Sequence, residues 1–220
     1  MNTVSNLIPA TWSVALWSAL LLIAVFMARR CAWRMLADRD NLNVFLGATV
    51  AVLGLWLIKT GIKPGLHFHL LGATALTLMF RPGFALLAMG LVTLAVTLLS
   101  GQYAALPANV LIMGAVPVAV SWAIFRLADR HFTNHLFVYI FVNAFFGAAL
   151  AIAAVGFAST GFAAAVGAYP LDYLLDEYLP YYLLMAWAEA FATGMLITLM
   201  VVYKPEWVAT FDDRRYLFNK

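Results

Sequence analysis

Two histidines, His67 and His69, are the residues of this sequence best suited to metal chemistry. A neutral imidazole is a good ligand for nickel, cobalt, copper and zinc. Positions two apart on an α-helix are rotated by about 200°, so both rings can reach one ion only if this stretch is not helical. Pro64 and Gly65 directly precede the pair and favour a non-helical entry. The alternative interpretation is a pair of interfacial histidines that hydrogen-bond to a loop carbonyl.

Three further polar residues stand in strongly apolar surroundings: Asn109, Asn143 and Glu189. An ionised Glu189 inside a membrane needs a partner, a cavity or a proton. It is interpreted either as an ion or proton site or as a protonated acid that ties two helices together, with Asn143, a histidine, Thr193 or the backbone as partner. Asn109 follows Pro107 and is a second candidate for the site, or a helix cap. Asn143 is expected to hydrogen-bond between helices.

No catalytic signature accompanies these residues, so we do not expect an enzyme. The sequence holds no Gly-x-Ser-x-Gly, no His-Glu-x-x-His and no phosphate-binding loop. His131 and His135 lie among charged residues and are interpreted as part of a solvated loop. Any ATP-driven action therefore requires a partner protein.

The composition determines which kind of fold must position these residues. Of the 220 residues, 65% are hydrophobic and 10% charged, and the mean hydropathy is +0.92. These values exclude a soluble domain, a disordered chain and a nucleic-acid-binding protein. We expect a single all-α polytopic membrane domain over residues 1–220, ending in a short cytoplasmic tail at 204–220, in a bacterial-type inner membrane. The one cysteine, Cys31, excludes an internal disulfide.

Apolar segments predict a compact bundle of about seven transmembrane helices, six to seven in all. Pro82 cannot extend a helix and Arg81 avoids lipid, so the third and fourth segments are joined by a tight turn at a membrane face. Trp56 and four other tryptophans are interpreted as interface anchors. The segments are Leu7–Ala28, Leu42–Ile58, Leu66–Phe80, Gly83–Leu99, Leu106–Leu127, Leu136–Ala158 and Leu179–Tyr203.

The basic residues predict the orientation of the bundle. Alternating loops place eleven of the 13 Lys and Arg residues on one side and only Lys59 and Lys63 on the other. Because basic loops stay in the cytoplasm, we expect the N-terminus outside and the C-terminus inside. His67 and His69 then lie on the outer side. The eleven are Arg29, Arg30, Arg34, Arg39, Arg81, Arg126, Arg130, Lys204, Arg214, Arg215 and Lys220.

Four motifs in order resemble the membrane substrate-binding subunit of cobalt and nickel energy-coupling-factor transporters, the CbiM/NikM type. His69-Leu70-Leu71-Gly72 precedes an apolar run and the Arg81-Pro82-Gly83 turn. The segment from Pro107 to Gly114 is similar to the family's Gly-Ala-Asn-x-x-Asn-Met-Gly, with Ile112 at the second Asn. The stretch from Glu189 to Thr193 resembles Glu-Gly-x-x-Thr, and Lys204-Pro205-Glu206 resembles Arg-Pro-Glu. The match covers roughly residues 60–206.

This resemblance implies an outward-facing metal site and, as partners, ATPase subunits and a coupling membrane subunit. A divalent transition metal ion (nickel, cobalt, copper or zinc) would be the substrate, and no firm cofactor is implied. The family's site uses a Met-His N-terminus together with the histidine of the His-Leu-Leu-Gly stretch. Here the chain begins Met1-Asn2, so only His69 carries over as a ligand, with His67 as a hypothetical local replacement.

Two function hypotheses follow. The first is the membrane permease component of an energy-coupling-factor importer for a divalent transition metal, with His69 and His67 as ligands and Asn109, Asn143 and Glu189 around the site or in the bundle core. The second is an accessory protein that keeps the fold, associates with another membrane complex and does not transport. The missing histidine at position 2 motivates this alternative.

Overall fold

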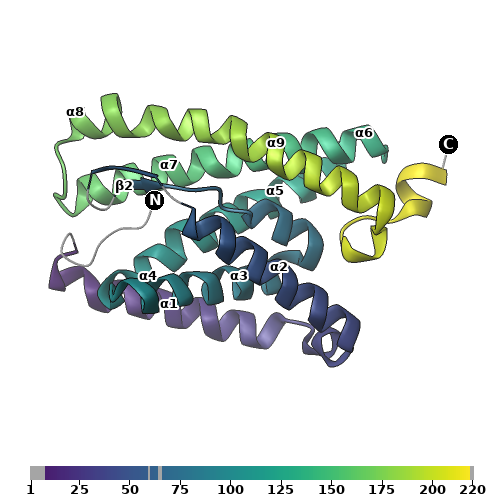
Figure 1. Cartoon of the computed structure of the whole chain (residues 1–220), viewed down its shortest axis with the longest axis horizontal. Helices are drawn as coiled ribbons and strands as arrows, with labels where there is room; N and C mark the ends of the chain where they lie inside the picture. Colours follow the sequence, from purple (N-terminus) through teal and green to yellow (C-terminus); the bar gives the residue numbers. More distant parts are fainter. Residues whose placement is uncertain (1–7, 59, 64–65, 219–220) are drawn as a thin grey trace.

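The computed structural model describes residues 8–58, 60–63 and 66–218, and it is an all-α bundle (Figure 1). Six helices in this part of the chain are long and apolar enough to cross a membrane. Many large apolar side chains on their outer faces are exposed, such as Val14 and Leu22 near the N-terminus and Leu184 and Met195 near the other end. An apolar surface of this kind is stable in contact with the hydrocarbon chains of lipid. The predicted membrane bundle is therefore confirmed, with six helices of spanning length: Ala10–Arg29, Arg39–Leu57, Ala73–Ser100, Tyr103–His131, Leu136–Ala165 and Leu171–Tyr203.

The bundle has two ends, which we name by their chain segments. The hairpin end carries two short strands, β1 (Thr60–Lys63) and β2 (Leu66–Phe68), together with α8 (Leu171–Tyr173), on the left of Figure 1. The tail end carries α6 (Leu136–Val138) and the C-terminal segment on the right. The helix ends and turns that bear most of the arginines lie at the tail end.

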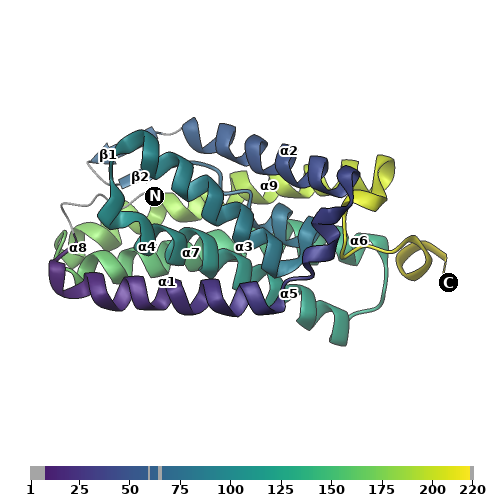
Figure 2. The same ribbon diagram turned by 90° about the horizontal axis from the view of Figure 1, so that it is seen from below.

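The first two helices run in opposite directions between these ends. α1 (Ala10–Arg30) lies along the outside of the bundle (Figure 2). A short turn, η2 (Trp33–Ala37), leads into α2 (Arg39–Leu57). Asp38 starts α2, because its carboxylate accepts the N–H groups of Asp40 and Asn41 at 2.9 and 3.0 Å. Trp56 is buried near the other end of α2 and is only 1% exposed, so its interpretation as an interface anchor is wrong.

The predicted span Leu66–Phe80 is not one helix. β2 pairs antiparallel with β1, with Thr60 opposite Phe68 and Gly61 opposite His67. Residues 69–72 are non-helical, and helix begins only at Ala73. The apolar composition of this stretch suits a buried strand and loop as well as a membrane helix, which is why composition alone misassigned it.

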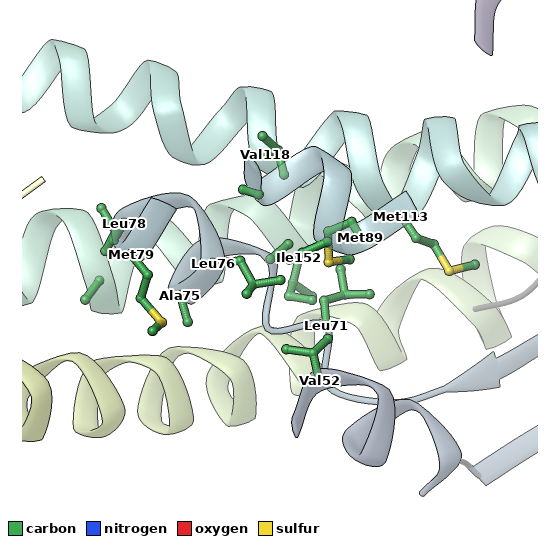
Figure 3. Close-up of a cluster of buried hydrophobic side chains, with 14 of the residues drawn as sticks. Val52, Leu71, Ala75, Leu76, Leu78, Met79, Met89, Met113, Val118 and Ile152 are labelled. Atoms are coloured by element: carbon green, nitrogen blue, oxygen red, sulfur yellow. The ribbon is translucent and has the colours of Figure 1, made fainter. Parts of the chain in front are cut away.

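α3 (Ala73–Ser100) contains a chain reversal at Arg81, whose φ of 62° and ψ of 167° are non-helical. Phe45 of α2 contacts both Phe80 and Phe84, at ring-centroid distances of 5.4 and 6.0 Å. In Figure 3, Met89 and Leu71 lie at nearly the same horizontal position, well to the right of Met79, although a continuous helix would carry Met89 away from Leu71 beyond Met79. Segment 73–80 therefore runs toward the tail end and segment 83–100 runs back, as the predicted Arg81-Pro82 turn requires. Segment 73–80 is about 12 Å long, too short to span a membrane.

Three spanning helices, each built from consecutive helical elements, complete the bundle. η3 (Tyr103–Ala105) and α4 (Leu106–Asn109) lead through the π-helical η4 (Val110–Ala115) into α5 (Val116–His131). α6 and the π-helical η5 (Tyr139–Phe146) precede α7 (Gly147–Ala165). α8 and η6 (Leu174–Tyr178) precede α9 (Leu179–Tyr203). α7 packs closely on α9, because a Cβ on Gly156 would lie only 2.7 Å from the Tyr182 side chain.

The C-terminal segment folds back onto the bundle instead of leaving it as a free tail. After η7 (Pro205–Trp207), the N–H groups of Ala209 and Thr210 donate to the carbonyls of Met79 and Leu78 at 3.0 and 3.2 Å. η8 (Arg214–Phe218) then packs against α5 through an ion pair between Arg215 and Asp129. Segment 208–211 thus closes the carbonyl end of helical segment 73–80.

Candidate functional site

The loop that carries His69 joins β2 to α3 at the hairpin end. It ends at Gly72, whose φ is +69°, a left-handed value that glycine adopts without steric cost. A Cβ on Gly72 would also lie 2.8 Å from the Val52 side chain of α2. Both the backbone conformation and the close approach of α2 therefore require glycine at this position.

Glu189 of α9 fixes this loop from across the bundle. Its Oε2 accepts the N–H of Leu71 at 2.8 Å, and its Oε1 accepts the N–H of Gly72 at 2.7 Å. The side chain is only 2% exposed. The partner of Glu189 is thus the backbone, one of the four partners expected from sequence. Its carboxylate stands where helical segment 73–80 begins, the end of a helix dipole that favours negative charge.

His69 is buried against Trp56. The two ring centroids are 4.4 Å apart with an interplanar angle of 42°. Trp56 in turn donates from Nε1 to the Leu71 carbonyl at 3.1 Å. His69 Nδ1 lies 3.1 Å from the Leu70 carbonyl. A carbonyl can only accept, so in this bond Nδ1 donates and the lone pair of the ring belongs to Nε2, the tautomer typical of metal-ligating histidines.

His67 lies two residues earlier, in β2, and is half-buried. Both histidines therefore stand in non-helical backbone, which is the condition that the helical spacing argument sets for a shared ion. Between them, Phe68 packs against Tyr178, Tyr181 and Tyr182, at centroid distances of 5.6, 5.6 and 5.4 Å. This aromatic cluster ties β2 to α9. Pro64 and Gly65 lie outside the described residues.

Among the described residues, the hydrogen bonds of Glu189 come from the N–H groups of Leu71 and Gly72 and from neither of the two asparagines. Asn109 is buried on α4, four residues into the helix, and its side chain caps no helix terminus. Asn143 is buried in η5. In the described part of the chain its Oδ1 has no hydrogen-bond partner, and an interhelical hydrogen bond from its side-chain N–H groups stays a prediction. The structure joins His69, Trp56 and Glu189 around the 69–72 loop, and a role of the two asparagines in the site stays a prediction.

Sequence reasoning missed Trp56 and the hydroxyl pair of Tyr178 and Tyr182, whose oxygens are 2.7 Å apart. The four-residue spacing of the tyrosines on one helix face is the signal that points to such a pair. Nothing local marks Trp56, because a tryptophan near a span end is usually an interface anchor.

The metal-ligating capacity of the described residues is limited. Among them, no group of three or more His, Cys, Asp or Glu side chains could hold an ion. Met1 and Asn2, where the chain departs from the Met-His start, lie outside the described residues. At the hairpin end, the proposed ligands that suit a borderline metal are the two imidazoles. The Glu189 carboxylate is engaged by two backbone N–H groups.

Comparison with known proteins gives a family and a fold. Residues 4–207 match the family model of CbiM, described as the cobalt uptake substrate-specific transmembrane region. A crystal structure of a truncated transition metal transporter is similar to this chain, with a TM-score of 0.79 and 18% identity over 92% of this chain and 99% of that one. A second transition metal transporter structure has a TM-score of 0.77 and 18% identity, over 91% and 92%. No protein with a curated description matches the chain.

Proposed function

Since the chain belongs to the CbiM family of cobalt-uptake transmembrane regions, we propose that it is the substrate-binding membrane component of an importer for divalent transition metal ions. It is a multi-pass membrane protein of metal uptake and a transport protein, not an enzyme. The proposed substrate is a cobalt- or nickel-like ion, and the proposed ligands are His69 and His67.

The observation that carries this proposal is the fixed loop at residues 69–72. A metal ligand has to be held in one orientation to bind well. Here the His69 ring is stacked on Trp56, while Glu189 holds the backbone of the next two residues with two short hydrogen bonds. Glu189 is proposed as a positioning residue for this loop.

The orientation and the partners are part of the proposal. Positive residues favour the cytoplasmic side, and they concentrate at the tail end. The hairpin end with His69 is therefore proposed to face outside. Members of this family are membrane components of cobalt uptake systems, and the chain has no phosphate-binding loop of its own. An ATPase pair and a coupling membrane subunit of the energy-coupling-factor type are the proposed partners.

The direct test is metal titration of the purified full chain. Isothermal calorimetry with nickel, cobalt, copper and zinc is compared between the wild type and a His67→Ala/His69→Ala variant. A His131→Ala/His135→Ala variant is the matched control, because these two histidines lie around the end of α5 and the start of α6. We expect loss of binding only in the first variant. Equal affinity of the first variant and the wild type for every ion would exclude the metal site.

A second candidate function rests on the small number of metal ligands, since no group of three or more His, Cys, Asp or Glu side chains among the described residues could hold an ion. In this case the chain keeps the fold as an accessory subunit of another membrane complex and transports nothing. Affinity purification from membranes separates the two candidates. Recovery of ATPase subunits supports transport, and a stable complex with a different membrane enzyme supports the accessory role.

A further inference from the structure

A cavity lies at the tail end, at the opposite end of the bundle from the His69 loop. Its volume is about 430 Å³, within the range of about 300–1,000 Å³ that is usual for ligand sites. Three separate parts of the chain line it: the α3 reversal, the last turns of α5, and the folded-back C-terminal segment. The lining includes Arg81, Arg126, Arg215, Trp122, Phe125 and Thr210.

The acidic groups of this cavity are engaged by other residues. Asp129 pairs with Arg215, and Asp212 Oδ1 accepts the N–H of Arg214 at 2.9 Å. Over residues 8–58, 60–63 and 66–218, neither Arg81 nor Arg126 forms an ion pair with a carboxylate. The lining therefore holds three arginines and two carboxylates, a net charge of +1, and Arg81 and Arg126 both lie outside the Arg215–Asp129 pair.

The position of Arg81 is held by the fold. Its backbone has a left-handed φ of 62° at the chain reversal, and its guanidinium lies 3.5 Å from the carbonyl of Ala209. Ala209 itself donates to Met79. Arg81 is therefore directed toward the C-terminal segment, across the cavity from α5.

The remaining lining places the cavity at the depth of a membrane interface. Trp122 and Phe125 are stacked with their centroids 5.2 Å apart, directly before Arg126 on α5. Arg126 lies about 7.5 Å from the end of α5 at His131. Aromatic rings beside arginines are typical of the headgroup region, and basic pockets between membrane helices bind anionic headgroups.

We propose that this cavity binds a phosphate-type anion, held by Arg81 and Arg126. Arginine suits this role, because its planar fork of donors matches phosphate oxygens with two bonds. The anion has two sources, the headgroup of an anionic phospholipid or free phosphate, and the chemistry is the same for both.

The test uses the purified full chain in detergent. Native mass spectrometry measures the binding of phosphatidylglycerol and phosphatidylcholine to the wild type and to an Arg81→Gln/Arg126→Gln variant. The control is Arg130→Gln/Arg214→Gln, which removes the same charge from neighbouring exposed positions outside the cavity. We expect affinity for phosphatidylglycerol to fall about tenfold in the first variant relative to the control. Inorganic phosphate is titrated in a second arm.

The arms separate the outcomes. Preference for phosphatidylglycerol that only the cavity variant loses supports the lipid source, and phosphate binding that only this variant loses supports the free anion. Equal losses in both double variants would show diffuse interfacial charge and overturn the proposal, as would unchanged binding of both ligands. Arg126→Gln alone changes one exposed helical residue. It must weaken binding with an unchanged melting temperature, which keeps the test independent of misfolding.

Discussion

Helical segment 73–80 is held at both of its ends by distant parts of the chain, but by different chemistry. At the hairpin end, two backbone N–H groups donate to the Glu189 carboxylate. At the tail end, the Leu78 and Met79 carbonyls accept backbone N–H groups from the C-terminal segment, and Leu78 also accepts the Thr210 hydroxyl at 2.7 Å.

The two ends differ because different hydrogen-bonding groups lie near each end of helical segment 73–80. Donors at a helix start are matched best by negative charge. The described helices that contact the loop, α2 and α9, offer side chains but no unused backbone groups. At the tail end an extended segment is available and offers its own N–H groups. The Leu71 and Gly72 N–H groups at the hairpin end therefore depend on one side chain, whereas the tail end shares its bonds among several groups.

The largest effect should come from Glu189→Leu. This change leaves two buried N–H groups without their acceptor, at about 1–3 kcal/mol each, so we expect a loss of about 4 kcal/mol in unfolding free energy. Glu189→Gln keeps one accepting oxygen and should lose less. Thermal melting in detergent measures both variants. A Leu variant as stable as the Gln variant would show that the carboxylate does not hold the loop.

The next largest loss of stability is expected from Gly156→Ala. Gly156 lies against Tyr182, which packs against Phe68 at the hairpin end. The new Cβ would lie 2.7 Å from Tyr182, and overpacking of this kind lowers stability by about 1–3 kcal/mol. Gly161→Ala on the same helix is the control, since no atom lies within 4 Å of its Cβ. Melting of the two variants is compared, and equal shifts would contradict the close packing of α7 on α9.

A smaller effect is expected at the tail end from Thr210→Val. The hydroxyl donates to Leu78 and lies 2.6 Å from the Tyr139 hydroxyl. Its loss should lower stability by about 1 kcal/mol, because the backbone bonds of Ala209 and Thr210 remain. Thr198→Val is the control, since that hydroxyl bonds only within its own helix, to Gly194. A loss as large as that of Glu189→Leu would remove the contrast between the ends.

The smallest effect concerns the reactivity of Cys31, which lies against Gly83 beside the α3 reversal. Burial raises the pKa of the Cys31 thiol. Less thiolate is then present at pH 8, so alkylation by iodoacetamide should be slower than for free cysteine and should rise with pH. Thr210→Val should raise this rate about twofold and Glu189→Leu should leave it unchanged. A faster alkylation of Cys31 in Glu189→Leu than in Thr210→Val would show that the two ends are coupled.

The sequence predicts those features of the fold that have local causes. Pro82 cannot continue a helix and Arg81 avoids lipid, and the chain indeed reverses there. The long apolar runs correspond to the six helices of spanning length. The short strands at 60–68 were not predicted, because an apolar run directly before a helix has the composition of a longer helix.

The candidate site was predicted only in part, for a physical reason. Glu189 was identified as a candidate because an ionised carboxylate is energetically unfavourable in an apolar segment. The backbone was among its expected partners. Which backbone it holds could not be predicted, since Leu71 lies 118 residues away in sequence. The burial of Trp56 and the return of residues 208–211 to the α3 reversal likewise depend on packing between distant segments, which no local pattern records.

The 118-residue separation between Glu189 and Leu71 also sets an order of events during synthesis. The chain leaves the ribosome from its N-terminus, so the loop with His69 is made long before α9 exists. The loop gains its acceptor only when the last long helix has entered the membrane. A nascent or truncated chain that lacks α9 therefore has both proposed histidine ligands but no fixed loop to present His69, so the proposed binding site forms last.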